Sequence, residues 1–272
     1  MLAGSIAVRR SSSASGGAIA AAIFLLIASK VHAGWVKGEF TSDGKPVEEY
    51  HCVPKGNGPH PAVVMLHGAA LRKDAGNDEY EEMCGELAEL GYYTEFIEYY
   101  SQTDAVGPGQ PALMVKDFPI WLREIHSGVD ALDKNPSVDP HRVALMGFSL
   151  GSFLALSAGA LDAKQIAAIV EYYGGLPPGL RAGAKSMPPV LILHGDKDVL
   201  VPVAQAHALD ELLTKENRPH EMKIYGGANH AFNFPGLPFW YNADDANDAW
   251  SRSVKFLGSN LNGGDTRGAS SK

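Results

Sequence analysis

The sequence predicts an α/β protein, in which a mostly parallel central sheet is covered by helices on both faces. Short continuous apolar runs, for example residues 62–66 and 143–146, have the length and composition of strands buried in a parallel sheet. Segments whose apolar residues recur with helical spacing alternate with these runs along the chain. The chain has 272 residues, a length that suits one large α/β domain, and it shows no internal repeat. We therefore expect one domain, with its ligand site where the carboxyl ends of the strands meet.

The expected elements follow one another in a regular order. Residues 47–53 alternate in polarity, as expected of an edge strand, and a Gly/Pro turn then leads to the strand at 62–66. A helix is expected over 78–90, and a functional loop over 101–111, because that stretch is long and rich in Gly and Pro. The remaining elements, in chain order, are strand 92–99, helix 113–134, turn 136–140, strand 143–146 with a helix directly after residue 149, strand 166–173, strand 189–194, helix 203–215, strand 222–225 and helix 242–257.

Both ends of the chain are expected to lie outside the folded domain, which we place at residues 34–257. Residues 1–33 have the layout of a signal peptide, because an arginine pair precedes a short apolar run at 17–28 and a small-residue cleavage sequence. That run is shorter than the roughly 20 residues that span a bilayer comfortably, and a retained membrane anchor is the alternative. The tail at 258–272 is polar and Gly-rich, and we expect it to be disordered. We expect a periplasmic or secreted protein without stable membrane association once the leader is removed.

The net charge argues against some classes of binding partner, and the cysteine content bears on the redox state of the compartment. The formal net charge is -8, and removal of the leader, with three basic and no acidic residues, leaves 20 basic against 31 acidic residues, or -11. This balance argues against nucleic acid or an anionic membrane surface as a partner. The two cysteines, Cys52 and Cys84, are either a disulfide of an oxidising compartment or two buried free thiols, and the sequence does not decide between them.

The stretch Gly147-Phe148-Ser149-Leu150-Gly151 is the main candidate for chemistry. It matches the G-x-S-x-G nucleophile elbow, and it has the required context of an apolar strand before it and a small-residue helix after it. A serine at such a sharp turn is held in a strained conformation, so that its hydroxyl projects above the edge of the sheet. Glycine on both sides of the turn relieves the crowding of the backbone. We therefore expect Ser149 to be a nucleophile.

A nucleophilic serine needs a histidine to take its proton and a carboxylate to hold that histidine, in the chain order Ser, Asp, His. Asp198 follows the strand at 189–194 where the turn re-enters apolar sequence, so we expect it to face inward, whereas Asp196 beside a lysine is expected to be solvated. A helix cap is the alternative interpretation of both aspartates. Elimination among the histidines favours His230, on the loop after the last strand, as the base. His67 and His194 each precede a glycine at a strand end and are expected to hydrogen-bond loop backbone instead.

The remaining site predictions concern backbone amides and the substrate pocket. The oxyanion of a tetrahedral intermediate needs two N–H donors, which we expect from Leu150 and from Ala69, with Ala70 or Leu71 as neighbours of the latter. No metal-ligand motif occurs, so neither a metal nor another cofactor is expected. Aromatic residues on the loops that should wall the pocket are either substrate contacts or ordinary packing. They are Tyr99, Tyr100, Tyr172, Tyr173, Phe232, Phe234 and Trp240, of which Tyr100, Tyr172 and Phe232 are our pocket candidates. Arg72, Arg123 and Arg181 are unranked candidates for binding a carboxylate.

With these residues in place, the chain resembles the dienelactone hydrolase family of the α/β-hydrolase superfamily. The resemblance rests on the loop that starts at Leu66-His-Gly-Ala and on four further stretches, at residues 147–151, 170–174, 194–202 and 225–234. It implies an α/β-hydrolase fold with Ser149 as nucleophile, Asp198 as acid and His230 as base. One departure matters, because the founding members of the family carry cysteine at the elbow and a nearby activating glutamate. Here the position is serine and residues 67–72 contain no glutamate, so dienelactone itself is a doubtful substrate.

We therefore expect an exported serine hydrolase that cleaves a small-molecule carboxylic ester or lactone through an acyl-enzyme on Ser149. A peptidase or an acyltransferase on the same fold is the first alternative. A non-catalytic binding protein with the same fold is the second, and an incomplete triad would favour it.

Overall fold

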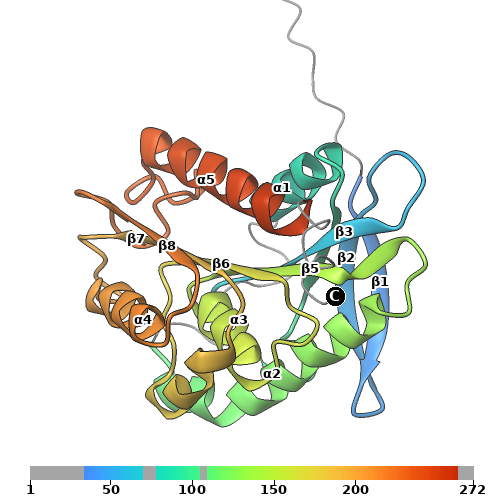
Figure 1. Ribbon diagram of the computed structural model, residues 1–272, viewed down its shortest axis with the longest axis horizontal. Coiled ribbons are helices and arrows are strands. Elements are labelled where there is room, and N and C mark those ends of the chain that lie inside the picture. Colours follow the sequence, from blue (N-terminus) through green and yellow to red (C-terminus); the bar gives the residue numbers. More distant parts are fainter. Residues whose placement is uncertain (1–33, 70–77, 105–108, 263–272) are drawn as a thin grey trace, which may run out of the picture. The chain divides into compact units, whose positions relative to one another are not determined.

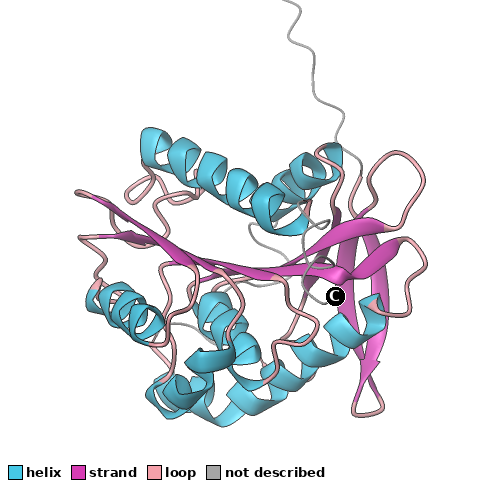
Figure 2. Ribbon diagram, viewed as in Figure 1, coloured by secondary structure: helices cyan, strands magenta, loops and turns pink. Residues whose placement is uncertain are grey.

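The computed structural model describes residues 34–69, 78–104 and 109–262, and within these residues the chain forms one eight-stranded sheet (Figures 1 and 2). The strand order is β1-β2-β4-β3-β5-β6-β7-β8; β3 to β8 are parallel to one another, and β1 and β2 are antiparallel additions. The strands are β1 Val36–Ser42, β2 Lys45–Cys52, β3 His60–Leu66, β4 Tyr93–Ile97, β5 Val138–Phe148, β6 Ala168–Tyr172, β7 Val190–Gly195 and β8 His220–Tyr225. The helices are α1 Asp78–Glu89, α2 Pro111–Leu132, α3 Leu150–Leu161, the 3-10 helix η1 Pro178–Ser186, α4 Ala204–Lys215 and α5 Ala243–Leu261. The predicted fold class is confirmed.

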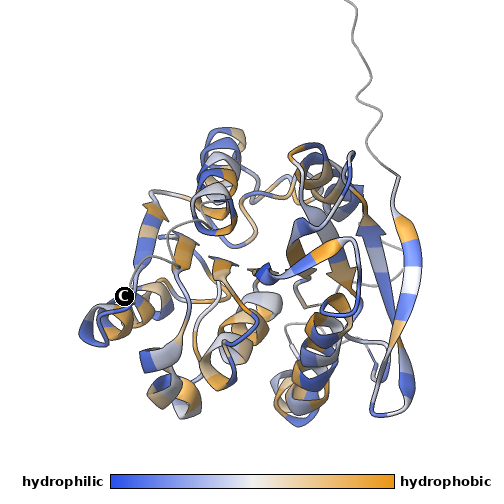
Figure 3. Cartoon of the chain, turned by 45° about the vertical axis from the view of Figure 1, so that its right-hand side comes forward, coloured by the Kyte–Doolittle hydropathy of each residue, from blue (hydrophilic) through white to orange (hydrophobic). Residues whose placement is uncertain are grey.

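Helices cover both faces of the sheet, and each face has its own apolar cluster. Helices α2, α3 and α4 pack on one face, whereas α1 and α5 pack on the other (Figure 1). In Figure 3 the strands in the middle of the sheet are mostly apolar, whereas the helices carry both polar and apolar bands. Apolar strands buried on both faces are the expected result of a parallel sheet between two helix layers. This arrangement brings the loops after β3, β5, β7 and β8 to a single edge of the sheet.

The sheet begins one strand earlier than the sequence pattern predicts. Residues 36–42 form β1, which pairs with β2 through a tight turn at Asp43 and Gly44, both at positive φ. The expected edge strand is therefore the second strand, and the true edge is β1, whose residues are mostly polar and exposed. An Asp-Gly pair is a strong hairpin signal, because both central residues of the turn need positive φ.

The structure also settles the state of the cysteines and the position of the C-terminal boundary. Cys52 of β2 and Cys84 of α1 form a disulfide. Helix α5 continues to Leu261, which is fully buried, so residues 258–261 belong to the fold and not to a disordered tail. The helix extends further than predicted because its last apolar residue still reaches the core. The predicted leader at 1–33 and the rest of the predicted tail, residues 263–272, lie outside the described residues. In the part of the chain that is described, no helix is both long and apolar enough to cross a membrane.

Candidate active site

Ser149 occupies the sharp turn between β5 and α3. Its backbone has φ 53° and ψ −114°, which is a strained conformation for a residue with a side chain. Neighbouring strands and the helix hold it there, since its N–H donates to Tyr172 O at 2.9 Å and its carbonyl accepts from Ser152 N at 2.9 Å. The expected nucleophile elbow is therefore present, with the hydroxyl at the carboxyl edge of the sheet.

The two glycines of the motif are required by close backbone contacts. A Cβ added at Gly147 would overlap the backbone of Gly151, and a Cβ added at Gly151 would overlap the carbonyl oxygens of Leu66 and His67. The loop after β3 therefore packs directly against the first turn of α3. This contact places the loop that was expected to supply the second oxyanion donor beside the nucleophile.

The structure brings the three predicted side chains together. His230 Nε2 lies 2.9 Å from Ser149 Oγ, and His230 Nδ1 lies 2.7 Å from Asp198 Oδ2. A carboxylate only accepts, so Nδ1 carries the hydrogen, and Nε2 of the neutral ring is left to accept from the serine hydroxyl. Asp198 has a fully buried side chain and His230 is 5% exposed. These are the contacts by which a serine is activated for attack.

Asp198 is held as an anion by donors on both of its oxygens. Oδ1 accepts from Leu200 N at 2.9 Å and Val201 N at 2.7 Å, while Oδ2 faces His194 Nε2 at 3.4 Å in addition to His230. Burial by itself would raise the pKa of Asp198, but hydrogen bonds from His194 and His230 outweigh burial and hold the pKa well below its usual range. The carboxylate can therefore stabilise an imidazolium at His230. Asp196, in contrast, is exposed and accepts from Gly227 N at 2.7 Å, as expected for a solvated residue.

The imidazole of His230 is fixed by its loop and by two aromatic rings. The ring of Tyr173 lies 4.7 Å from it, and Trp240 lies 6.1 Å away and nearly perpendicular. Asn229 Oδ1 accepts from His230 N at 2.7 Å and from Val199 N at 3.1 Å, which ties the loop after β8 to the loop after β7. Hydrogen bonds therefore join the loop that carries His230 to the loop that carries Asp198.

The two residues predicted to supply oxyanion donors lie in segments that adjoin Ser149. Leu150 is the first residue of α3, where an N–H has no acceptor within the helix. Gly68, next to Ala69, is close enough to Ser149 that an added Cβ would lie 3.5 Å from the serine Cβ. The roles of the Leu150 and Ala69 amides stay predictions. Ala70, Leu71 and Arg72 lie outside the described residues.

Two of the three pocket candidates, Tyr172 and Phe232, are almost fully buried, and their contact with substrate stays a prediction. Tyr172 is 1% exposed, and its hydroxyl is 2.8 Å from Ser253 of α5, so its side chain belongs to the core between the sheet and α5. Phe232 is fully buried in the same core, 4.8 Å from the ring of Tyr225. The sequence places both residues at the correct edge but does not reveal which helix layer their side chains face. Tyr100 packs against Trp121 at 5.2 Å, below the loop after β3, and its contact with substrate stays a prediction.

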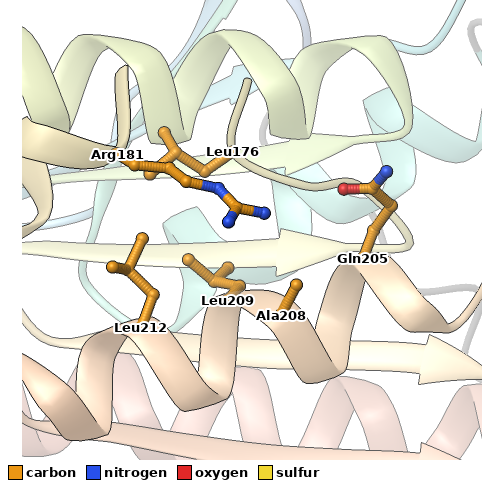
Figure 4. Close-up of a pocket in the computed structure, with 6 residues that line it drawn as sticks. All are labelled: Leu176, Arg181, Gln205, Ala208, Leu209 and Leu212. Carbon is orange, nitrogen blue, oxygen red and sulfur yellow. The ribbon is translucent and has the colours of Figure 1, made fainter. Parts of the chain in front are cut away.

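Two other cation candidates and one cavity do not involve Ser149, Asp198 or His230. Arg123 pairs with Asp43 at 2.8 Å on the β1–β2 hairpin. Arg181 contributes to a small cavity between η1 and α4, which has a volume of about 10 Å³, room for about one water molecule (Figure 4). The cavity is lined by Leu176, Arg181, Gln205, Ala208, Leu209 and Leu212. Among the described residues, no group of three His, Cys, Asp or Glu side chains could hold a metal ion.

Buried glutamates near the site were missed by the sequence analysis. Glu171 of β6 is fully buried and accepts from Gly174 N at 2.8 Å. Burial raises its pKa to about 7, an effect partly offset by His194. Glu98, directly after β4, is 2% exposed and faces His67. The available signal was a carboxylate in or beside an otherwise apolar strand, which is rarely tolerated without a partner.

Comparison with known proteins agrees with this geometry. The sequence matches the dienelactone hydrolase family over residues 47–261. A protein of Aquifex aeolicus provisionally named carboxymethylenebutenolidase is 25% identical over 226 residues, which cover 80% of this chain and 96% of the relative. A Bradyrhizobium protein named as a probable 2-oxo-3-(5-oxofuran-2-ylidene)propanoate lactonase is 24% identical and covers 82% of this chain and 92% of its own.

A solved structure from Klebsiella pneumoniae, provisionally named a dienelactone hydrolase, has a TM-score of 0.69 at 24% identity. It covers 82% of this chain and 98% of its own, and at this identity it shows the shared fold. The family match begins within β2 and spans the rest of the described sheet, including the turn at Ser149 and the loops that carry Asp198 and His230. The chain therefore belongs to the dienelactone hydrolase family and is a carboxylic ester hydrolase of that family.

Proposed function

We propose that this protein is an exported serine hydrolase that cleaves a carboxylic ester or lactone through an acyl-enzyme on Ser149. The observation that carries the proposal is the continuous line of contacts from Ser149 Oγ to His230 Nε2, at 2.9 Å, and from His230 Nδ1 to Asp198 Oδ2, at 2.7 Å. Both distances are those of hydrogen bonds, and the order of the groups is that of nucleophile, general base and orienting acid.

In the first half of the reaction, Ser149 Oγ attacks the carbonyl carbon of the substrate and its proton moves to His230 Nε2. The electron pair of the carbonyl double bond moves to oxygen, and the amides of Leu150 and Ala69 stabilise that oxyanion. Asp198 keeps its negative charge beside the imidazolium and remains unprotonated. When the tetrahedral intermediate collapses, the alcohol oxygen leaves with the proton from Nε2. In a lactone this alcohol stays attached to the acyl group.

In the second half, water attacks the acyl carbon of the Ser149 ester while His230 Nε2 takes a proton from it. Collapse of the second tetrahedral intermediate breaks the bond between Oγ and the acyl carbon, and Oγ recovers a proton from Nε2. The products are the carboxylic acid and the free enzyme, so no redox partner or cofactor is needed to balance the reaction. An acyltransferase would differ only in using an alcohol or amine in place of this water.

Exposed apolar side chains on the two loops that carry Asp198 and His230 favour an apolar substrate. Val199 and Leu200 lie on the loop of Asp198 and are 68% and 42% exposed, while Leu237 and Phe239 lie on the loop of His230 and are 44% and 99% exposed. Exposed apolar surface at the edge of the sheet where these loops lie would favour binding of an apolar ligand. We therefore infer an ester or lactone with an apolar acyl or alcohol group.

Export is supported by two independent features. The predicted leader at 1–33 has the charge and apolar run of a signal peptide. The Cys52–Cys84 disulfide belongs to a kind of cross-link that persists in oxidising compartments. Fractionation of cells that express the full chain should yield a periplasmic or secreted protein lacking the first 33 residues. Recovery of the full-length chain in the cytosol would contradict export while leaving the chemistry untouched.

The chemistry is tested with short p-nitrophenyl esters, lactones and a fluorophosphonate probe. Wild-type protein should turn over these substrates and be labelled by the probe. Ser149→Ala should lose at least ~10⁴-fold in kcat and all labelling. Ser251→Ala, at an exposed serine of α5, is the matched control and should behave as wild type. Equal labelling of Ser149→Ala and Ser251→Ala would refute the acyl-enzyme. Faster cleavage of amides than of esters would indicate a peptidase. Ligand binding without turnover would indicate a binding protein.

A further inference from the structure

One buried histidine outside the triad is the first residue of the loop after β3. The side chain of His67 is fully buried, and its Nδ1 lies 2.8 Å from the carbonyl oxygen of Gly68. A carbonyl oxygen only accepts, so Nδ1 must carry the hydrogen of this bond. The mechanism described above makes no use of this histidine.

The bond to Gly68 determines the direction of the next backbone amide. The peptide bond between Gly68 and Ala69 is planar and trans, so its N–H points opposite to its C=O. With the C=O of Gly68 held toward the buried imidazole, the N–H of Ala69 is directed away from it. A rotation of this one peptide plane would instead turn the amide into the protein and present a carbonyl oxygen, which repels an oxyanion.

The imidazole of His67 is itself held from every side. Its ring stacks on Tyr99 at 3.8 Å with an interplanar angle of 5°, and the Tyr99 hydroxyl donates to the backbone oxygen of His67 at 2.6 Å. Tyr100 packs edge-on at 4.8 Å. Nε2 faces Glu98 Oε1 at 3.3 Å, and this carboxylate is almost fully buried. The ring therefore cannot turn its Nδ1 away from Gly68 without losing several contacts at once.

We propose that His67 is a positioning residue that holds the Ala69 N–H toward the oxyanion of the tetrahedral intermediate. This inference rests on the proposed function, because it assigns a part of the same site. It predicts that substitution of His67 weakens stabilisation of the transition state and leaves substrate binding unchanged. The reason is that the amide is aimed at a negative charge that exists only in the transition state. His67 contacts neither substrate nor the reacting atoms, and acts only through the peptide plane.

Two polar substitutions separate the contributions of the two ring nitrogens of His67. In His67→Asn the side-chain nitrogen is as many bonds from Cα as Nδ1, so the donor to Gly68 O is kept. In His67→Gln the side-chain nitrogen matches Nε2, so a donor toward Glu98 is kept and the one to Gly68 is lost. We expect the kcat of His67→Asn to stay within ~3-fold of wild type. The kcat of His67→Gln should fall ~10- to 100-fold with little change in KM. Removal of a whole oxyanion donor typically lowers kcat about 10²- to 10³-fold.

A transition-state analogue distinguishes positioning from a loss of folded protein. An alkyl trifluoromethyl ketone adds to the serine and forms a tetrahedral oxyanion, so its Ki should rise in His67→Gln by the same factor by which kcat/KM falls. A Ki, unlike kcat, does not depend on the fraction of protein that is folded. The proposal is overturned if His67→Gln is no worse than His67→Asn, or if its Ki stays at the wild-type value while kcat falls.

His220 supplies the matched control, because its Nδ1 lies 2.8 Å from the carbonyl oxygen of Arg218 at the opposite edge of the sheet. His220→Asn and His220→Gln should both leave kcat and Ki unchanged. Ser149→Ala separates this inference from the function on which it rests. If Ser149→Ala is inactive and His67→Gln is fully active, the positioning role alone is refuted; if Ser149→Ala is active, the proposed function is refuted.

Discussion

Replacement of Asp198 by asparagine should move the ring hydrogen of His230 from Nδ1 to Nε2. The side chain at position 198 keeps almost the same shape. Asparagine can keep its oxygen in the place of Oδ1, where it still accepts from Leu200 N and Val201 N. The amide nitrogen then replaces Oδ2, which lies 2.7 Å from His230 Nδ1. An amide N–H cannot face another N–H, so Nδ1 must become the acceptor and the hydrogen must move to Nε2.

The size of the effect follows from this change of tautomer. A hydrogen on Nε2 points at Ser149 Oγ, 2.9 Å away, and prevents the ring from taking the serine proton. Loss of the correct tautomer in a serine triad lowers kcat by about 10⁴-fold, or ~5.5 kcal/mol of transition-state stabilisation. His194 Nε2, 3.4 Å from Oδ2, would also face the new amide nitrogen, so the free energy of unfolding should fall by about 1–3 kcal/mol.

The assay is kcat for a p-nitrophenyl ester, measured with thermal unfolding of the same samples. Asp196→Asn is the control, because Asp196 is exposed and stands two residues away on the same loop. It should keep wild-type kcat, since its contact is with Gly227 N and not with the base. If Asp198→Asn keeps more than a tenth of the wild-type kcat, or if Asp196→Asn shows the large loss instead, the assignment of the acid is wrong.

Three further predictions concern stability. Burial raises the pKa of Glu124 to about 8. The carboxyl group of Glu124 loses its proton above about pH 4.3 in the unfolded chain but keeps it in the folded protein. The free energy of unfolding should therefore fall as the pH rises from about 4 towards 8. Glu124→Gln should therefore be more stable than wild type by about 3 kcal/mol at pH 7 and equal to it at pH 4, measured by urea denaturation. Removal of the Cys52–Cys84 disulfide, which spans 32 residues, by a double serine substitution should cost about 3–4 kcal/mol in the same assay. Gly151→Ala should prevent normal folding or lower Tm by more than about 10 °C, because the new Cβ overlaps Leu66 O.

The outcomes that contradict these predictions are distinct. A pH-independent difference between Glu124→Gln and wild type would show that this carboxyl group is not protonated in the folded state at neutral pH. If wild type and the double serine variant unfold with equal free energies, with and without reductant, the two cysteines do not form a disulfide. A Gly151→Ala variant with wild-type Tm would mean that the loop after β3 does not pack against the elbow; Gly179→Ala, where an added Cβ meets no other atom within 4 Å, is the control.

Features that depend on local sequence were predictable. Apolar runs of strand length alternate with amphipathic helices, and this alternation is enough to predict a parallel sheet between two helix layers. In such a sheet all strands end at one edge, so Ser149, Asp198 and His230 could be placed together from their positions after strands alone. The choice of Asp198 over Asp196 also depended on local context, namely which of the two aspartates adjoins apolar residues.

The tertiary structure decided the features that depend on which face, or which distant segment, a side chain meets. Tyr172 and Phe232 sit at the predicted edge, yet their side chains belong to the apolar cluster on the α5 side of the sheet, because the packing of a strand end and of a loop decides which face a side chain meets. The pairing of Cys52 with Cys84 required the distance between β2 and α1. A bond from His67 to loop backbone was predictable, but the choice of Gly68 O as its acceptor required the packing of the ring against Tyr99 and Glu98. Periodicity in a sequence records how each segment is shaped, whereas these contacts depend on how the segments pack against one another.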